Sequence, residues 1–350
     1  MSERQLTAYS DSLYNPYYGY FSKEAVIFSP GDPFDFKSLK NDKEFHQLLG
    51  RRYTTFEDEL DKKEPNDVRQ LWHTPTELFR PFYGEAIGRY LVTNYKLNSY
   101  PYHDLLIYEM GAGNGTLMLN ILDYIRDTHP EVYERTKYRV IEISPALAAM
   151  QTSRLAQTAE SRGHDRKVEI INRSIFDWKT YVSSPCFFLA LEVFDNFAHD
   201  VLRYDPVTEE ALQGHVFIDV HGEMYEYYSR SLDASASRFL RVRDAACSSS
   251  YNHPLSTSRT WRTIRSRLPF AANLTDPEYV PTRLMDFFDV LYTYFPAHKL
   301  VTSDFHYLPN AIKGVNAPVV QTRYQRQTVP VTTPLVCLAT SSYVPTVSLA

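Results

Sequence analysis

The segment LLIYEMGAGNGTL at residues 105–117 constrains the fold most, because a strand, a glycine-rich turn and a helix start follow one another there. The apolar run 105–108 is typical of a strand that is covered on both faces. The turn contains Gly111, Gly113 and Gly115, which let the backbone bend sharply and approach a ligand closely. Apolar residues then recur at helical spacing. This order predicts an α/β fold whose ligands bind beyond the carboxyl ends of the strands.

The spacing within the turn bears on the identity of the ligand. Dinucleotide-binding turns have the pattern G-x-G-x-x-G, whereas this chain has E-x-G-x-G-x-G beginning at Glu109. The turn also lacks the Gly-Lys-Ser/Thr ending of a P-loop. An acidic residue just before the glycines suits a cationic ligand such as S-adenosylmethionine, which carries an ammonium group and a sulfonium. A turn without a ligand and a dinucleotide-dependent dehydrogenase are the weaker alternatives.

Carboxylates also follow the next three predicted strands, which cover residues 138–143, 168–171 and 187–191. Glu142 lies at the end of the first, where sheets of this kind hydrogen-bond ribose hydroxyls. Asp177 follows the second, and we expect it to accept from an adenine amino group; an ordinary turn aspartate is the alternative. Glu192 and Asp195 follow the third, near the mouth of the sheet.

Motifs in a fixed order over most of residues 11–325 resemble the MidA-type family of class I S-adenosylmethionine methyltransferases. The segments that carry the resemblance are LYNPYYGYFS, HTPTELFRPFYGEAIGRYL, EMGAGNGTLMLNILDYIR, VIEISPAL and LALEVFDNFAHD. The resemblance implies a Rossmann-like class I sheet with helices on both faces and S-adenosyl-L-methionine as cofactor. It further implies an arginine-bearing protein substrate, a subunit of respiratory complex I, with symmetric dimethylation, a role in complex I assembly and a mitochondrial location. A homodimer stays open.

Methyl transfer is a displacement at a carbon already activated by the sulfonium, so the protein chiefly positions the reactants and places charge. A guanidinium is planar, always charged and a poor nucleophile. We therefore expect Glu192 to be the first catalytic clamp and Asp195 its partner, which together orient the acceptor and take up its proton; for Glu192 the alternative is a turn cap. Glu77 and Glu85 are weaker candidates for a second acidic wall. The segment 17–20 (YYGY) is expected to close over the donor pocket, with a packed aromatic terminus as the alternative.

Two departures from the family pattern keep other functions open. Leu191 and Ala198 stand where the family usually has Asn and Pro. A methyltransferase of another acceptor class, and a non-catalytic assembly or scaffold protein that keeps the fold, are the alternatives. The family's location is expected to depend on a presequence, and none is visible in MSERQLTAYSDSL.

Composition limits the partners. The net charge is −5 and no long basic run occurs, which argues against nucleic acid. The three cysteines, Cys186, Cys247 and Cys337, lack C-x-x-C spacing, and the eleven histidines are scattered, so we predict no metal site. The apolar runs are too short for a membrane span.

The pattern along the chain predicts four regions. Residues 1–80 form a cap of loops and short helices, residues 81–200 form the cofactor-binding core, residues 201–330 form a β-meander and helical insertion that returns to the core sheet, and residues 331–350 form a disordered tail. Within these, residues 81–96 and 282–295 are predicted helices, 299–305 and 318–324 late strands, and 244–260 a flexible Ser-rich connection.

Overall fold

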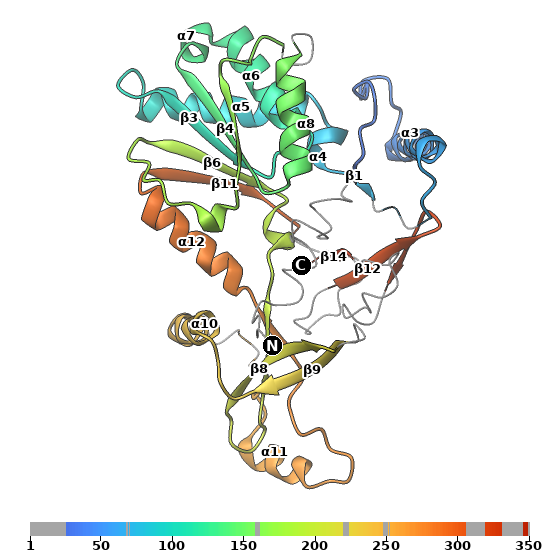
Figure 1. Ribbon diagram of the computed structural model, residues 1–350, viewed down its shortest axis with the longest axis vertical. Helices are drawn as coiled ribbons and strands as arrows, with labels where there is room; N and C mark the ends of the chain where they lie inside the picture. The colour runs from blue at the N-terminus through green and yellow to red at the C-terminus, as the bar shows by residue number, and fades with distance from the viewer. Residues whose placement is uncertain are drawn as a thin grey trace.

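The computed structural model describes residues 26–67, 69, 71–157, 162–219, 224–247, 251, 253–305, 319–330 and 346–348. Its centre is a five-stranded sheet in the order β11-β6-β3-β4-β5 (Figure 1). These strands are β3 (Leu105–Met110), β4 (Thr136–Glu142), β5 (Val168–Asn172), β6 (Cys186–Leu191) and β11 (His298–Ser303). All their pairings are parallel. The strand order reverses between β3 and β6, so the ligand crevice is expected at that point.

Both faces of this sheet are covered, as the continuous apolar runs predict. On one face Ile107 and Val140 pack against α5 (Phe82–Asn98) and α6 (Thr116–Thr128). On the other face Tyr108 and Phe188 pack against α12 (Thr282–Tyr294). The remaining core helices are α7 (Pro130–Tyr133) and α8 (Pro145–Ala156). The predicted class I sheet with helices on both faces is therefore confirmed.

The N-terminal region contains one long helix, α3 (Asp42–Lys63), so the prediction of loops and short helices was wrong here. Asn41 caps it by accepting from the amide of Glu44. Despite its many charges, the helix carries a stripe of apolar residues at helical spacing, which packs with the buried Phe28 and Phe34. The same region contains β1 (Val26–Ile27), β2 (Leu71–Trp72) and α4 (Pro75–Leu78).

A second, antiparallel sheet has the strand order β10-β7-β8-β9, which confirms the predicted meander. Its strands are β7 (Asp200–Tyr204), β8 (Ala211–Ile218), β9 (Met224–Ser229) and β10 (Glu278–Val280), and it is joined by α10 (Ala234–Ala246) and α11 (Arg259–Ser266). Sheet and helices form a lobe that extends away from the core (Figure 1).

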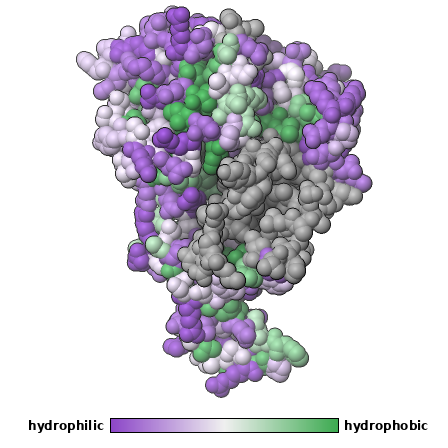
Figure 2. Space-filling model, in the orientation of Figure 1, coloured by the Kyte–Doolittle hydropathy of each residue, from purple (hydrophilic) through white to green (hydrophobic). Residues whose placement is uncertain are grey.

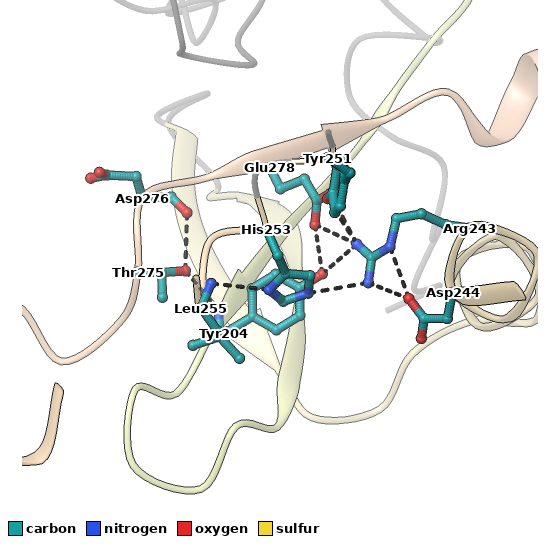
Figure 3. A network of polar contacts seen from close by, with 9 residues as sticks. All are labelled: Tyr204, Arg243, Asp244, Tyr251, His253, Leu255, Thr275, Asp276 and Glu278. Carbon is teal, nitrogen blue, oxygen red and sulfur yellow. Dashed lines mark hydrogen bonds and ion pairs between the residues drawn. The ribbon is translucent and has the colours of Figure 1, made fainter. Parts of the chain in front are cut away.

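A buried ionic network holds this lobe together (Figure 3). Glu278 is only 4% exposed and accepts from Arg243 at 2.8 Å and from the Tyr204 hydroxyl at 2.6 Å. The Tyr251 hydroxyl also donates to Glu278, and Arg243 lies 3.3 Å from His253. Tyr251 and His253 belong to the segment predicted as a flexible connection. Where that segment is described, α10 and β10 therefore fix it in place.

A third sheet contains β12 (Val319–Tyr324), β13 (Gln327–Pro330) and β14 (Thr346–Ser348) in the order β13-β12-β14. The late strands predicted at 299–305 and 318–324 thus exist, but only β11 returns to the core sheet. Arg323 of β12 pairs with the buried Glu57 of α3, with Nη2 2.9 Å from Oε2. Of the predicted tail, the described residues are those of β14. In the described part of the chain no helix has the length and apolar character needed to cross a membrane.

Candidate functional site

A cavity of about 290 Å³ lies at the carboxyl ends of the core strands, close to the lower end of the range typical of small-molecule sites. Six of the predicted site residues line it: Glu109, Gly111, Gly113, Glu142, Glu192 and Asp195. The structure therefore brings together residues that are up to 86 positions apart in the sequence. The segment 17–20, predicted to cover this region, lies outside the described residues.

The glycine-rich turn forms one wall. Gly111, Gly113 and Gly115 have φ angles of 70°, 53° and 74°, a conformation that other residues rarely adopt. Gly111 donates its amide to the carbonyl of Ile141 on the neighbouring strand β4, at 3.1 Å. Gly115 does not line the cavity; it is the N-cap of α6 and shapes the turn instead. The turn thus points the start of α6 toward the crevice, as in sheets that bind nucleotides.

Glu109 is the last residue but one of β3 and is 4% exposed. Its Oε2 accepts from the Tyr138 hydroxyl at 2.7 Å. Burial raises the pKa of Glu109 to about 7, opposed by the Tyr138 hydrogen bond and assisted by the charge of Glu142. A cation in the cavity would offset the cost of this buried charge.

Glu142 is the last residue of β4 and is 3% exposed. Its Oε1 accepts from the amide of Ser144 at 2.9 Å, and its Oε2 lies 3.4 Å from the Gln151 amide nitrogen. Gln151 of α8 also donates to the carbonyl of Gly113 at 2.8 Å. Burial raises the pKa of Glu142. The carboxylate is held in one orientation and keeps lone pairs for the hydroxyl groups of a ligand.

Glu192 and Asp195 follow β6, at the other side of the crevice from Glu142. Glu192 has a φ of 55°, a left-handed conformation that is costly for a residue with a side chain. Its amide donates to the carbonyl of Ser303 at 2.8 Å. Burial, with the neighbouring charge of Asp304, raises the pKa of both carboxyls to about 7. The site therefore concentrates negative charge in a poorly hydrated place.

Asp304 is the functional candidate that the sequence reasoning missed. Its Oδ2 accepts the amides of Phe194 and Asp195 at 2.9 and 3.3 Å, so it holds η2 (Phe194–Asn196) in place. It directly follows β11, whose last residue, Ser303, pairs with Leu191 of β6. An acidic residue at the end of the predicted strand 299–305 was the available signal. In the described part of the chain, no group of acidic, histidine or cysteine side chains could hold a metal ion.

Glu77 lines the cavity, but its carboxylate is already engaged. It is 2% exposed and accepts from the Thr116 hydroxyl at 2.6 Å and the Asn114 amide at 3.1 Å, and it pairs with Arg80 at 3.2 Å. Glu77 therefore lies in the cavity wall and also fixes the glycine-rich turn, and its part in a second acidic wall stays a prediction. Glu85 does not line the cavity.

Asp177 is not brought to the site. It ends the 3-10 helix η1 (Ile175–Asp177), is exposed, and does not line the cavity. Ile175 is buried in the apolar cluster on the α12 face of the sheet. This orientation of the short helix leaves Asp177 exposed to solvent. Ser174, Ile175 and Phe176 line the cavity in its place. The structure therefore places Asp177 outside the cavity wall, which does not support the predicted adenine contact.

The walls and rim fit a ligand with an aromatic part and cationic groups. Apolar side chains that line the cavity include Ile27, Met110, Leu147 and Phe176, while the buried carboxylates described above lie at the strand ends. The two positions that depart from the family pattern, Leu191 and Ala198, are also in the wall. These apolar walls and acceptor carboxylates suit the sulfonium, ammonium and ribose of S-adenosyl-L-methionine. Fold and site together define a class I methyltransferase architecture.

Comparisons with known proteins agree with this class. Residues 86–337 match the model of a family described as "Putative S-adenosyl-L-methionine-dependent methyltransferase". The chain belongs to this family, and its cofactor is S-adenosyl-L-methionine. The resemblance on which the sequence analysis rested is thereby confirmed.

Two relatives stand out. The chain is 27% identical over 245 residues to "Protein arginine methyltransferase NDUFAF7 homolog, mitochondrial" of Schizosaccharomyces pombe. The aligned region covers 69% of this chain and 52% of that protein. The chain thus spans about half the length of this curated relative. A protein from Burkholderia thailandensis described as a "likely methyl transferase" and solved bound to S-adenosyl-homocysteine aligns with a TM-score of 0.55 at 13% identity, over 98% of this chain and 67% of that chain. At this identity the second comparison supports the fold alone.

Proposed function

We propose that this protein transfers a methyl group from S-adenosyl-L-methionine to a nitrogen of an arginine side chain in a protein substrate. One observation carries the proposal: Glu192 and Asp195, with Asp304 beside them, concentrate acidic groups on the cavity that Glu109 and Glu142 also line. A permanently charged guanidinium is the acceptor that such an acidic end favours most.

Residues of the first two strands hold the donor. Glu109 faces its ammonium group, Glu142 accepts from the ribose hydroxyls, and Gly111 and Gly113 let the backbone approach closely. When bound, the cofactor supplies a methyl carbon that the sulfonium has already activated. The chain's own task is then to align the acceptor nitrogen with that carbon and to exclude water.

Glu192 and Asp195 act on the acceptor. Two carboxylates can bind a planar guanidinium through paired hydrogen bonds and so aim one nitrogen at the methyl carbon. A pKa of about 7 keeps each carboxyl near the point where it can accept the proton that nitrogen loses. Asp304, by accepting the amides of the 194–195 turn, positions both groups. The left-handed backbone of Glu192 supports the assignment, because such strain concentrates at functional sites.

The finer assignment extends the proposal. The name of the Schizosaccharomyces pombe relative supports arginine as the acceptor and the mitochondrion as the location. We include in the proposal a subunit of respiratory complex I as the substrate, symmetric dimethylation as the outcome and complex I assembly as the role, on the family resemblance of the sequence. Net charge of −5 is compatible with a basic, arginine-bearing partner.

A non-catalytic protein that binds the cofactor is the second candidate. Leu191 lines the cavity at the position where the family usually has an amide side chain. An aliphatic side chain there removes a polar group from the wall in which the acceptor would lie. The experiment below separates the two candidates.

Donor binding is tested first, by calorimetric titration of the protein with S-adenosyl-L-methionine. We expect binding in the wild-type protein and its loss in Gly113→Val and Glu142→Ala, with the far-ultraviolet circular dichroism unchanged. Gly113 has a φ of 53°, and a Cβ added there would lie 2.6 Å from the Ile27 side chain. Unchanged affinity in both variants would remove the basis of the site assignment.

Methyl transfer is tested second, by mass spectrometry of peptides that carry arginine or lysine. We expect modified arginine with the wild-type protein, and loss of transfer but retained donor binding in Glu192→Gln. Glu85→Gln is the matched control, because Glu85 does not line the cavity. Modified lysine would support another acceptor class, and donor binding without any transfer would support the non-catalytic candidate.

A further inference from the structure

The end of the lobe opposite the core sheet carries apolar side chains that nothing in the described part of the chain covers. It consists of α11 and the turn that follows (Figure 1). Trp261 is 57% exposed, Ile264 52%, Leu268 57% and Phe270 fully exposed. Figure 2 shows hydrophobic and hydrophilic side chains side by side on this projection. Large apolar groups gathered on an exposed surface mark an interaction site more often than scattered single ones do.

Helix α11 is oriented with its apolar row outward. Trp261 and Ile264 are three residues apart on α11 and share one side of the helix, and Leu268 follows two residues after its end. On the other side Arg262 is 8% exposed and donates to the carbonyls of Pro206 at 3.2 Å and Leu255 at 2.6 Å. Arg262 also pairs with Glu209 of the β7–β8 connection. Helix α11 therefore packs on the lobe through the buried Arg262, while its apolar side chains are exposed and can contact a partner outside the lobe.

The segment that carries this row contains basic residues and no acidic ones. Residues 245–275 contain four arginines and neither Asp nor Glu, although the whole chain has a net charge of −5. One of the four, Arg262, is compensated by Glu209. The other three, Arg259, Arg265 and Arg267, are exposed beside the apolar row. The complementary surface must therefore be anionic and able to accept apolar side chains.

An anionic lipid bilayer meets both requirements. Helices with Trp, Phe and Leu on one side and basic residues on the other bind in the interface of such membranes. Arginine can reach lipid phosphates while its carbon chain stays in the apolar region. Nucleic acid fits less well, because Ile264 and Leu268 cannot stack on bases or hydrogen-bond to them. Phe270, which is fully exposed and has a left-handed conformation with φ of 63°, adds an aromatic ring to this surface.

We propose that the tip of the lobe, formed by Trp261, Ile264, Leu268 and Phe270 with the three exposed arginines, docks the protein on the surface of an anionic lipid bilayer. The tip and the core sheet lie at opposite ends of the molecule (Figure 1). Docking in this way leaves the cavity at the strand ends accessible to cofactor and substrate. The membrane is touched at one surface and is not spanned.

Cosedimentation with vesicles tests the proposal on the full chain. The probes are vesicles of phosphatidylcholine alone and of phosphatidylcholine mixed with phosphatidylglycerol. We expect binding to the mixed vesicles at least tenfold stronger than to the neutral ones, and weaker binding as salt rises. Tryptophan emission should shift to shorter wavelength on binding, because Trp261 is the exposed tryptophan of this tip.

Variants separate the tip from the rest of the molecule. W261S/L268S and R265Q/R267Q should each reduce binding to the mixed vesicles at least tenfold and leave cofactor affinity unchanged. Leu97→Ser is the matched control, since Leu97 is 78% exposed on α5 of the core, and it should bind vesicles like the wild type. Equal binding by all variants, or no binding to either vesicle, would overturn the proposal. So would self-association or RNA binding that W261S/L268S abolishes while vesicle binding is absent.

Discussion

Glu77 gives the sharpest test of how the glycine-rich turn is held. Glu77 is 2% exposed, and its carboxylate accepts hydrogen bonds from the Thr116 hydroxyl and the Asn114 amide. It also forms an ion pair with the Arg80 guanidinium. It therefore ties α4, which precedes the core, to the turn and the first residue of α6. Removing the carboxylate leaves a buried hydroxyl and a largely buried guanidinium with fewer partners.

The expected cost follows from these contacts. Breaking a buried charge pair by deleting one partner costs about 3–5 kcal/mol. Arg80 keeps a hydrogen bond to the carbonyl of Gly31, so we expect Glu77→Ala to lower the free energy of unfolding by about 3 kcal/mol, at the lower end of that range. Glu77→Gln keeps an acceptor for Thr116 but loses the charge, and the expected cost is about 1–2 kcal/mol. Because the turn then loosens, cofactor affinity should fall about tenfold in Glu77→Ala, or about 1.4 kcal/mol.

Urea unfolding and calorimetric titration measure these two quantities. Glu131→Gln is the control, because Glu131 pairs with Lys96 at 2.6 Å but is about half exposed, and we expect no change from it. The Glu77→Ala/Thr116→Val double-mutant cycle should give a coupling energy of about 0.5–3 kcal/mol. The reasoning is refuted if Glu77→Ala is no less stable than Glu131→Gln, or if the coupling energy is zero.

Three further predictions concern charge and packing. The rate of methyl transfer should increase with pH through about 7, as measured by a pH–rate profile. Below its pKa Glu192 is protonated, and it then neither binds a guanidinium as a carboxylate nor accepts a proton. Glu109 ionises near 7 when folded and near 4.5 when unfolded, so the folded protein loses stability as pH rises between these values. Glu109→Gln should therefore raise the free energy of unfolding by about 2–3 kcal/mol at pH 8 and hardly at pH 4.5, by urea titration at both. Gly84→Ala should cost about 1–3 kcal/mol, because the added Cβ would lie 2.6 Å from the Asn120 Cβ. Gly50→Ala, with nothing within 4 Å, should stabilise α3 by about 0.5–1 kcal/mol, and urea unfolding measures both changes.

The sequence predicted those parts of the fold that local patterns determine. The strand, turn and helix at 105–128 are contiguous, and their apolar periodicity is strong, so β3 and α6 were assigned correctly. The charged segment before them was misread because its charges hid a stripe of Phe45, Tyr53 and Phe56 at helical spacing. Tertiary packing on that stripe decides the structure of α3, and composition alone does not reveal it.

The position of a cavity residue was predictable where its strand neighbours, in the sheet, the strand that is next to it in the sequence. Glu109 and Glu142 belong to β3 and β4, which are adjacent both in sequence and in the sheet. Asp304 reaches the backbone of the 194–195 turn beside the cavity only because β11 pairs with β6, more than 100 residues away in sequence. Asp177 failed for the opposite reason, since a single 3-10 turn was enough to rotate it out of the cavity.

The carboxylates of the cavity make sense together only if a cation binds there. Burial raises the pKa of Glu109, Glu142, Glu192 and Asp195, so at neutral pH the folded chain incurs a free-energy cost for each that ionises. Apolar replacements of similar size would give a more stable protein. A bound cation lowers these pKa values and recovers the cost only when the ligand is present. The gathering of carboxyls with raised pKa values at one cavity thus supports the proposal that a positively charged methyl donor and acceptor bind there.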